Sequence, residues 1–122
     1  MFQLKLDFTL EKPELPLELD RLLVSFIKAS TKLYESLYDK TKSVIKPFAF
    51  SYYLPGGRFK DDKILLQETR FSMFFSNADL AQMILFFNSF KMMKFQHYPI
   101  KNNSMTLTSV RTRTLQRNRS YY

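Results

Sequence analysis

The first ten residues of the chain alternate between apolar and polar side chains. The apolar positions are Phe2, Leu4, Leu6, Phe8 and Leu10. Polar residues occupy the positions between them. Successive side chains of a strand point to opposite faces, so a period of two gathers every apolar residue on one face. The pattern therefore predicts a strand over residues 1–10 with one buried face and one solvated face.

The next apolar residues recur with the spacing of a helix between residues 17 and 38. They are Leu19, Leu22, Leu23, Phe26 and Ile27. Positions i, i+3, i+4, i+7 and i+8 share one face of a helix, so this stripe predicts an amphipathic helix. Ser30 and Thr31 are predicted to interrupt it and to cap a second short helix ending at Tyr38.

Residues 45–54 form a second alternating stretch, rich in aromatic side chains. Phe48, Phe50 and Tyr52 would share one face of a strand. Aromatic residues favour a pleated, half-buried surface, and Pro47 fits the first position of a strand, where a missing N–H is tolerated. A Pro-Gly-Gly turn ends the run. We predict that this is the central strand of the sheet, followed by its hairpin partner.

The second half of the chain predicts one more helix and further strands. A strand passes through residues 69–76, and the Ser-Asn-Ala-Asp sequence at 76–79 resembles a helix-capping motif. An apolar helical stripe follows from Leu80. Residues 95–100 and 105–110 then read as two strand segments around a polar turn.

This order of elements predicts the fold class. Strand, helix, strand, strand, helix, strand is the split βαβ pattern of ferredoxin-like and RRM-like domains. We therefore expect an α+β fold in which residues 1–110 form a single domain, with an antiparallel sheet and two helices on one face. The other face would be free for a ligand or partner. Residues 111–122 are expected to form a basic C-terminal extension.

The composition narrows the compartment and the chemistry. A length of 122 residues fits one domain. The chain has no cysteine, which excludes disulfides, thiolate catalysis and Cys-bound zinc and suits the cytoplasm. No apolar run approaches the length of a membrane span, and the pattern of a signal peptide is missing from the first residues. We expect a cytoplasmic protein without a membrane partner.

The positive charge is unevenly distributed. The net charge is +8, and every acidic residue lies at or before Asp79. Such asymmetry favours a polyanionic partner, either nucleic acid or an acidic protein surface, although a solvated basic face would show the same pattern. The candidate RNA-binding or partner-binding residues are Lys94, Lys101, Arg111, Arg113, Arg117 and Arg119.

Motifs for catalysis or metal binding are few. The two glycines are adjacent, so a glycine-rich phosphate loop is excluded, and His97 alone does not make a zinc site of the usual kind. We expect no metal and no cofactor. Basic residues next to aromatic ones, as in Lys94 with Phe95, are typical of RNA-binding surfaces. The aromatic RNP1 motif of RRM proteins is absent.

Four segments carry a resemblance to a known family. They are the strand end at 9–13, the helix at 22–28, and the segments at 33–38 and 46–51. In this order they resemble the N-terminal half of the CRISPR-associated endoribonucleases that cut precursor CRISPR RNA within the repeat. The resemblance implies one of two tandem ferredoxin-like domains, metal-independent cutting by the 2′-hydroxyl of the RNA, and a place beside a CRISPR interference complex in a bacterial host cell.

The chain departs from that family at its active site as well as in its length. Tyr38 aligns where active members usually carry a histidine, whereas Lys46 matches a basic residue of the family's site. Tyrosine has an unperturbed pKa near 10, so it is a poor general base at pH 7. We therefore expect no catalytic residues; an active enzyme would depend on Lys46 and Tyr38.

Three hypotheses are compatible with these features. The favoured one is a non-catalytic, truncated relative that binds CRISPR RNA or docks into the interference complex, as a virus-encoded mimic that inhibits CRISPR immunity. The alternative is an active, metal-independent repeat-RNA endoribonuclease that works as a dimer or with a second chain. The third is a ferredoxin-like domain whose basic face binds an acidic protein and no RNA; salt-insensitive binding would favour it.

Overall fold

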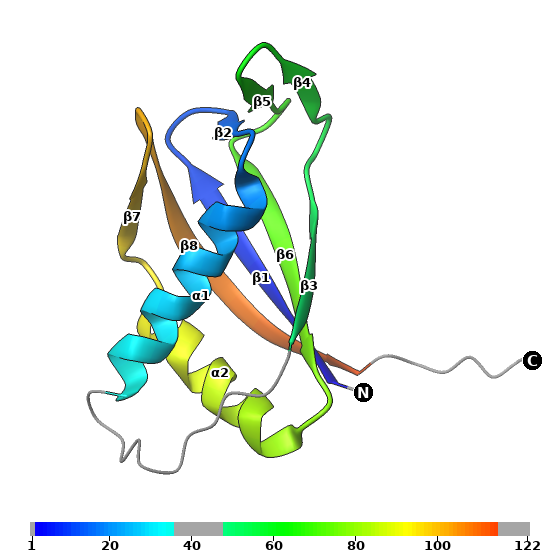
Figure 1. Ribbon diagram of the computed structural model, residues 1–122, viewed down its shortest axis with the longest axis vertical. Coiled ribbons are helices and arrows are strands. Elements are labelled where there is room, and N and C mark those ends of the chain that lie inside the picture. Colours follow the sequence, from blue (N-terminus) through cyan, green and yellow to red (C-terminus); the bar gives the residue numbers. More distant parts are fainter. Residues whose placement is uncertain (1, 36–47, 115–122) are drawn as a thin grey trace, which may run out of the picture.

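The computed structural model describes residues 2–35 and 48–114, which form two helices and two sheets (Figure 1). The helices are α1 (Leu19–Glu35) and α2 (Leu80–Met92). The strands are β1 (Phe2–Leu10), β2 (Glu14–Pro16), β3 (Ala49–Tyr53), β4 (Arg58–Lys60), β5 (Lys63–Leu65), β6 (Arg70–Asn77), β7 (His97–Ile100) and β8 (Asn103–Thr114). The large sheet has the order β3-β6-β1-β8-β7, and the small sheet the order β2-β5-β4.

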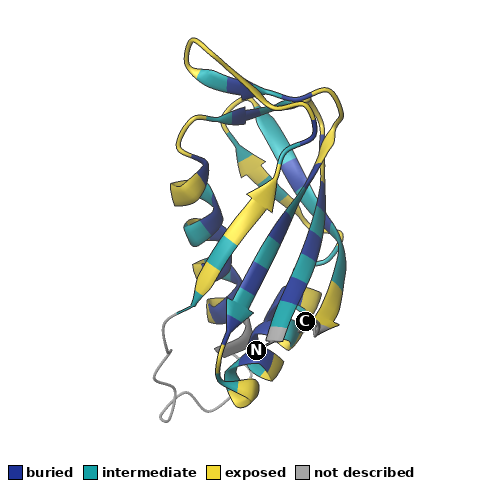
Figure 2. Ribbon diagram, turned by 90° about the vertical axis from the view of Figure 1, so that its right-hand side faces the viewer, coloured by how far each residue is buried: buried dark blue, intermediate teal, exposed yellow. Residues whose placement is uncertain are grey.

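The arrangement confirms the predicted fold class. All strand pairs of the large sheet are antiparallel. Both helices cover the same face of this sheet and leave the other face open (Figures 1 and 2). Four of its strands and the two helices follow the order strand, helix, strand, strand, helix, strand. The small sheet and β7, which forms a hairpin with β8, are additions to this order. The domain is therefore larger than a minimal βαββαβ unit.

The core lies between the helices and the large sheet. The apolar side chains of β1 from Leu4 to Leu10 are all buried, with Leu6 fully inaccessible. Phe8 stacks on Phe71 at a centroid distance of 4.9 Å and meets Phe26 edge-on at 5.2 Å. Each such buried side chain contributes about 1.5–3 kcal/mol relative to an exposed one. Alternating burial along the strands is visible in Figure 2.

The prediction that residues 45–54 form the central strand is wrong. This stretch supplies β3, which lies at one edge of the large sheet, whereas β1 lies in the middle. The predicted alternation itself is correct, because Phe50 is half-buried against the core and Tyr53 is 61% exposed. Alternation reports that one face of a strand is buried. It does not indicate whether the strand has neighbours on both sides, so the sequence pattern does not distinguish an edge strand such as β3 from a central one.

The predicted break of the first helix at Ser30 and Thr31 is also wrong. Helix α1 continues through both residues to Glu35. The Ser30 hydroxyl donates to the carbonyl of Phe26 at 2.8 Å, and the Thr31 hydroxyl donates to that of Lys28 at 3.0 Å. These bonds to the preceding turn satisfy both buried hydroxyls within the helix. The rest of the proposed second helix, including Tyr38, lies outside the described residues.

Strand β8 continues past the expected domain end at residue 110. It reaches Thr114 and pairs Arg111 with Lys5 and Arg113 with Gln3 of β1. Residues 111–114 therefore belong to the sheet rather than to the extension. One face of the strand is solvated there and these residues are polar, so the sequence shows no apolar alternation that would extend the predicted strand.

No helix within residues 2–35 and 48–114 is long and apolar enough to cross a membrane.

Candidate nucleic-acid interface

The solvated face of the large sheet, which we call the open face, carries aligned cations and an aromatic ring. Lys5 lies at the centre of this face, because β1 is the middle strand. It pairs with Phe74 of β6 on one side and with Arg111 of β8 on the other. Directly opposed residues of antiparallel strands share a face, so these three side chains form one row. Ser51 of β3 extends the row beyond Phe74.

A second cation approaches the same ring from the neighbouring row. The guanidinium of Arg113 lies 5.2 Å from the centroid of the Phe74 ring, within the range of a cation–π interaction. Phe74 is half-buried and Arg113 is exposed. The ring is thus partly exposed on the open face, with the positive charge of Arg113 over it.

One carboxylate lies among these cations. Asp7 accepts a hydrogen bond from the Ser72 hydroxyl at 2.8 Å and from the Arg111 guanidinium at 3.0 Å. The ammonium of Lys5 is 3.9 Å from the same carboxylate. Asp7 therefore holds Arg111 over the sheet and offsets one of the nearby positive charges.

A depression of about 310 Å³ lies over this part of the open face. Its polar lining includes Lys5, Asp7, Tyr53, Arg70, Ser72 and Arg111. Its volume is at the lower end of the range for pockets that take small ligands. The Arg70 guanidinium also hydrogen-bonds the Glu68 carboxylate, which raises the pKa of Arg70. The Glu68 carboxylate therefore offsets the positive charge of Arg70 where the depression approaches β6.

A second depression, of about 440 Å³, adjoins the first and brings His97 onto the open face. Thr9 lines both depressions. His97 pairs with Thr106, which pairs with Thr9, so the three share a face. The Thr106 hydroxyl is 3.1 Å from Nδ1 of His97. Sequence reasoning did not place His97 near other functional residues, because the register of β7 on β8 is needed for that.

The structure separates the predicted binding residues. Arg111 and Arg113 lie on the open face. Lys101 lies in the turn between β7 and β8, at the opposite end of β8, and Lys94 follows α2. The remaining candidates, Arg117 and Arg119, lie outside the described residues, as do Tyr38 and Lys46.

Several open-face residues escaped the sequence analysis. Lys5 occupies a polar position of the first predicted strand, and Phe74 lies within the strand predicted over residues 69–76. The signal that could have found them was the solvated phase of each strand, read together with the charge of its residues. The pairing of β1 with β6 and β8 is what makes them neighbours.

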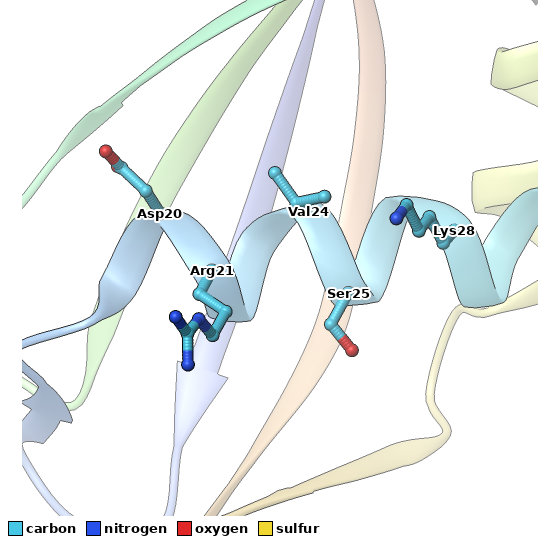
Figure 3. A pocket seen from close by; sticks show the side chains of 5 residues that line it. All are labelled: Asp20, Arg21, Val24, Ser25 and Lys28. Carbon is cyan, nitrogen blue, oxygen red and sulfur yellow. The ribbon is translucent and has the colours of Figure 1, made fainter.

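A larger depression, of about 610 Å³, lies elsewhere, on the outer side of α1 (Figure 3). It is lined by Asp20, Arg21, Val24, Ser25 and Lys28. Burial raises the pKa of Tyr52, and the nearby charge and hydrogen bond of Asp20 raise it further. This surface has Arg21 and Lys28 beside Asp20, and its lining residues include no aromatic side chain, whereas the open face has the Phe74 ring next to a cation.

The charged groups of the open face suit anion binding rather than metal chemistry. Within the part of the chain that the structure describes, no group of three or more His, Cys, Asp or Glu side chains is arranged to hold a metal ion. Phosphate groups would meet the cations around Phe74, and an unpaired base would meet the ring. This is what the arrangement can do chemically.

The sequence matches no protein-family model and no curated protein. Two solved structures resemble the fold. One is a CRISPR associated protein Cas6, with a TM-score of 0.68 and 11% identity, covering 96% of this chain and 50% of that chain. The other is described as "An RAMP protein binding different RNA substrates", with a TM-score of 0.75 and 12% identity, covering 97% of this chain and 50% of that chain. The chain thus spans half the length of both, and its fold is that of half a Cas6-like protein, as the sequence resemblance implied.

Proposed function

We propose that the protein binds CRISPR RNA through the open face. The observation that carries this proposal is the row of Phe74, Lys5 and Arg111 on the open face, with the Arg113 guanidinium over the partly exposed Phe74 ring. Cations bind the phosphate backbone, and an aromatic ring stacks on unpaired bases. The likeness to a Cas6 structure and to an RNA-binding RAMP protein supports RNA as the polyanion rather than an acidic protein.

In this proposal the protein binds the RNA without cutting it. Tyr38 stands where the family's histidine is expected, and a phenol with an ordinary pKa is a poor proton acceptor at pH 7. The chain matches half of each of the two solved structures, and we propose that it docks into the interference complex. We propose that it acts there as a virus-encoded mimic that inhibits CRISPR immunity.

The alternative function, metal-independent cutting of repeat RNA, gains one observation. His97 lies on the same face as the cations, in a depression that adjoins theirs. A histidine next to bound RNA is a candidate general base. Cleavage of labelled repeat RNA in EDTA that is lost in His97→Ala or in Tyr38→Phe would establish this function and contradict the non-catalytic one.

The binding proposal is tested with charge-matched variants. Lys5→Ala should weaken the affinity for labelled repeat RNA and reduce the salt slope of log Kobs by about 0.7, the loss expected for one phosphate contact to a single strand. Lys28→Ala on the outer side of α1 removes the same charge away from the open face and should change neither. Equal effects of the two variants would contradict the open face as the binding site.

The mimic proposal is tested by capture. The purified protein should retain an interference complex in a pull-down, and the variant Arg111→Ala/Arg113→Ala should retain less of it. Capture that is independent of these residues and of salt would instead favour a protein partner that recognises another surface.

A further inference from the structure

Phe95 is an exposed aromatic residue held in an unfavourable backbone conformation. It lies three residues beyond Met92, the last residue of α2, and 67% of its surface is exposed. Its φ angle is +65°, in the left-handed region. The other described non-glycine residues with positive φ are Asp61 and Asn102, which are types that tolerate this region.

The position of Phe95 is one at which glycine is usual. Phe95 is the third residue of a turn that the Gln96 N–H closes by donating to the carbonyl of Met93 at 3.2 Å. A positive φ at this place of a turn is mostly adopted by glycine, because a Cβ atom strains the conformation. Phe95 is fixed there by its N–H, which donates to the carbonyl of Leu107 in β8 at 2.8 Å. Burial does not offset the strain, since most of the ring is in solvent. Strained residues of this kind concentrate at functional sites.

The surroundings of the ring indicate the ligand. The Lys94 ammonium lies 5.1 Å from the centroid of the Phe95 ring. His97, two residues further, begins the edge strand β7 and lines the depression that adjoins the cation-lined one. An exposed ring with a cation beside it, in the connection that leads into the edge strand β7, suits a nucleotide whose base is unpaired.

We propose that Phe95 stacks on an unpaired base of RNA beside β7, with Lys94 contacting the adjacent phosphate. This inference rests on the proposed RNA-binding function and adds a stacking residue that favours a single-stranded segment of the RNA. Stacking is tolerant of sequence, because every base has a π-face. The site therefore selects for an unpaired strand rather than for a particular base.

The test uses the opposite effects of one substitution on stability and binding. Phe95→Gly relieves the backbone strain and removes a ring that contributes little buried surface. The Tm of the variant should therefore equal or exceed that of the original protein. The same variant should bind fluorescein-labelled single-stranded RNA of mixed sequence about 5- to 150-fold more weakly, the range for loss of one base–aromatic stack. Its salt slope should stay the same, because no phosphate contact is removed.

Three comparisons make the result specific. Phe95→Tyr should restore the affinity, since it keeps an aromatic ring. Ile84→Ala, which truncates an apolar side chain that is 54% exposed on α2, should leave the affinity unchanged. A blunt duplex of the same RNA sequence should bind Phe95→Gly as well as it binds the original protein, because its bases are already stacked.

The outcomes separate this inference from the proposed function. If Lys5→Ala weakens RNA binding and Phe95→Gly does not, the open face binds RNA and the stacking site is wrong. Equal losses of affinity of Phe95→Gly for single-stranded and duplex RNA would also overturn it. The same holds if Phe95→Gly loses only the capture of the interference complex and keeps its affinity for RNA. If the original protein binds no RNA, the proposed function fails, and this inference fails with it.

Discussion

Replacement of Asp7 by Asn should strengthen RNA binding and weaken the fold. Asp7 is the carboxylate among the cations of the open face, and its side chain is 28% exposed. It accepts from Arg111 at 3.0 Å and lies 3.9 Å from the Lys5 ammonium. The amide of Asn has nearly the same shape and can still accept from the Ser72 hydroxyl, so the substitution mainly removes one negative charge.

The size of both effects follows from this geometry. The partners of Asp7 are largely solvated, with the Arg111 side chain 60% exposed, so the loss of stability should be about 0.2–1 kcal/mol. Lys5, Arg111 and Arg113 give +3 and Asp7 gives −1, so the local charge rises from +2 to +3. Removing a carboxylate about 4–6 Å from a phosphate is worth about 1 kcal/mol in water, which is about a fivefold gain in affinity.

Fluorescence anisotropy with a labelled single-stranded RNA, over a range of salt concentrations, measures the effect on binding. The affinity of Asp7→Asn should rise at low salt, and the salt slope should steepen by about 0.7 if the freed cation takes up another phosphate. Urea unfolding gives the change in stability. A fall in affinity would refute this reasoning and would mean that Asp7 is needed to orient Arg111 for the RNA.

Three further predictions concern the core, the basic residues and the response to alkali. Leu6→Ala should lower the free energy of unfolding by about 2–5 kcal/mol in urea titrations, because Leu6 is fully buried; a loss below 1 kcal/mol would contradict its central position. Simultaneous replacement of four arginines by alanine should abolish binding of the RNA or complex at physiological salt, and unchanged affinity in a titration would contradict their assignment. These arginines are Arg111, Arg113, Arg117 and Arg119. The pKa of Tyr52 is raised in the folded state, so the fold binds more protons than the unfolded chain above pH 10 and loses stability as the pH rises; Tyr52→Phe should reduce this loss in unfolding curves between neutral pH and pH 11.

The local elements were predictable because their signals are local. The alternation of β1 and the stripe of α1 each report one buried face. The start of α2 was readable from the Ser-Asn-Ala-Asp sequence, but the cap differs from the predicted one. Asp79 is the N-cap and accepts a hydrogen bond from the backbone N–H of Gln82 at 3.1 Å, whereas the motif predicts Asp79 as the return group of a capping box that begins at Ser76. In each case a few neighbouring residues determine the outcome.

The order of strands and the composition of the open face were not predictable in this way. The central place of β1 depends on pairing with β6 and β8, whose residues are about 65 and 100 positions away in the chain. Lys5, Phe74 and Arg111 have no local signal in common. Only the register of three strands shows that they are neighbours, and the same holds for His97 on β7.

One feature of β8 shows how the register decides which residues reach the RNA. Met105 and Leu107 are buried, whereas Arg111 and Arg113, at positions of the same parity, are exposed. A regular strand would put all four on one face. The register shifts where Asp7 and Phe8 of β1 pair with Ser109 and Leu107, which leaves one extra residue, Thr108, in β8.

This bulge reverses the phase of β8 between its two halves. The Thr108 hydroxyl donates to the carbonyl of Asp7 at 3.1 Å and so fixes the extra residue against the middle strand. Because an inserted residue exchanges the two faces of a strand, the apolar half of β8 stays in the core while its arginines move to the open face. Without it, either Leu107 would lie in solvent or Arg111 in the core. Both the packing of the core and the cations around Phe74 therefore depend on this single irregularity in the sheet.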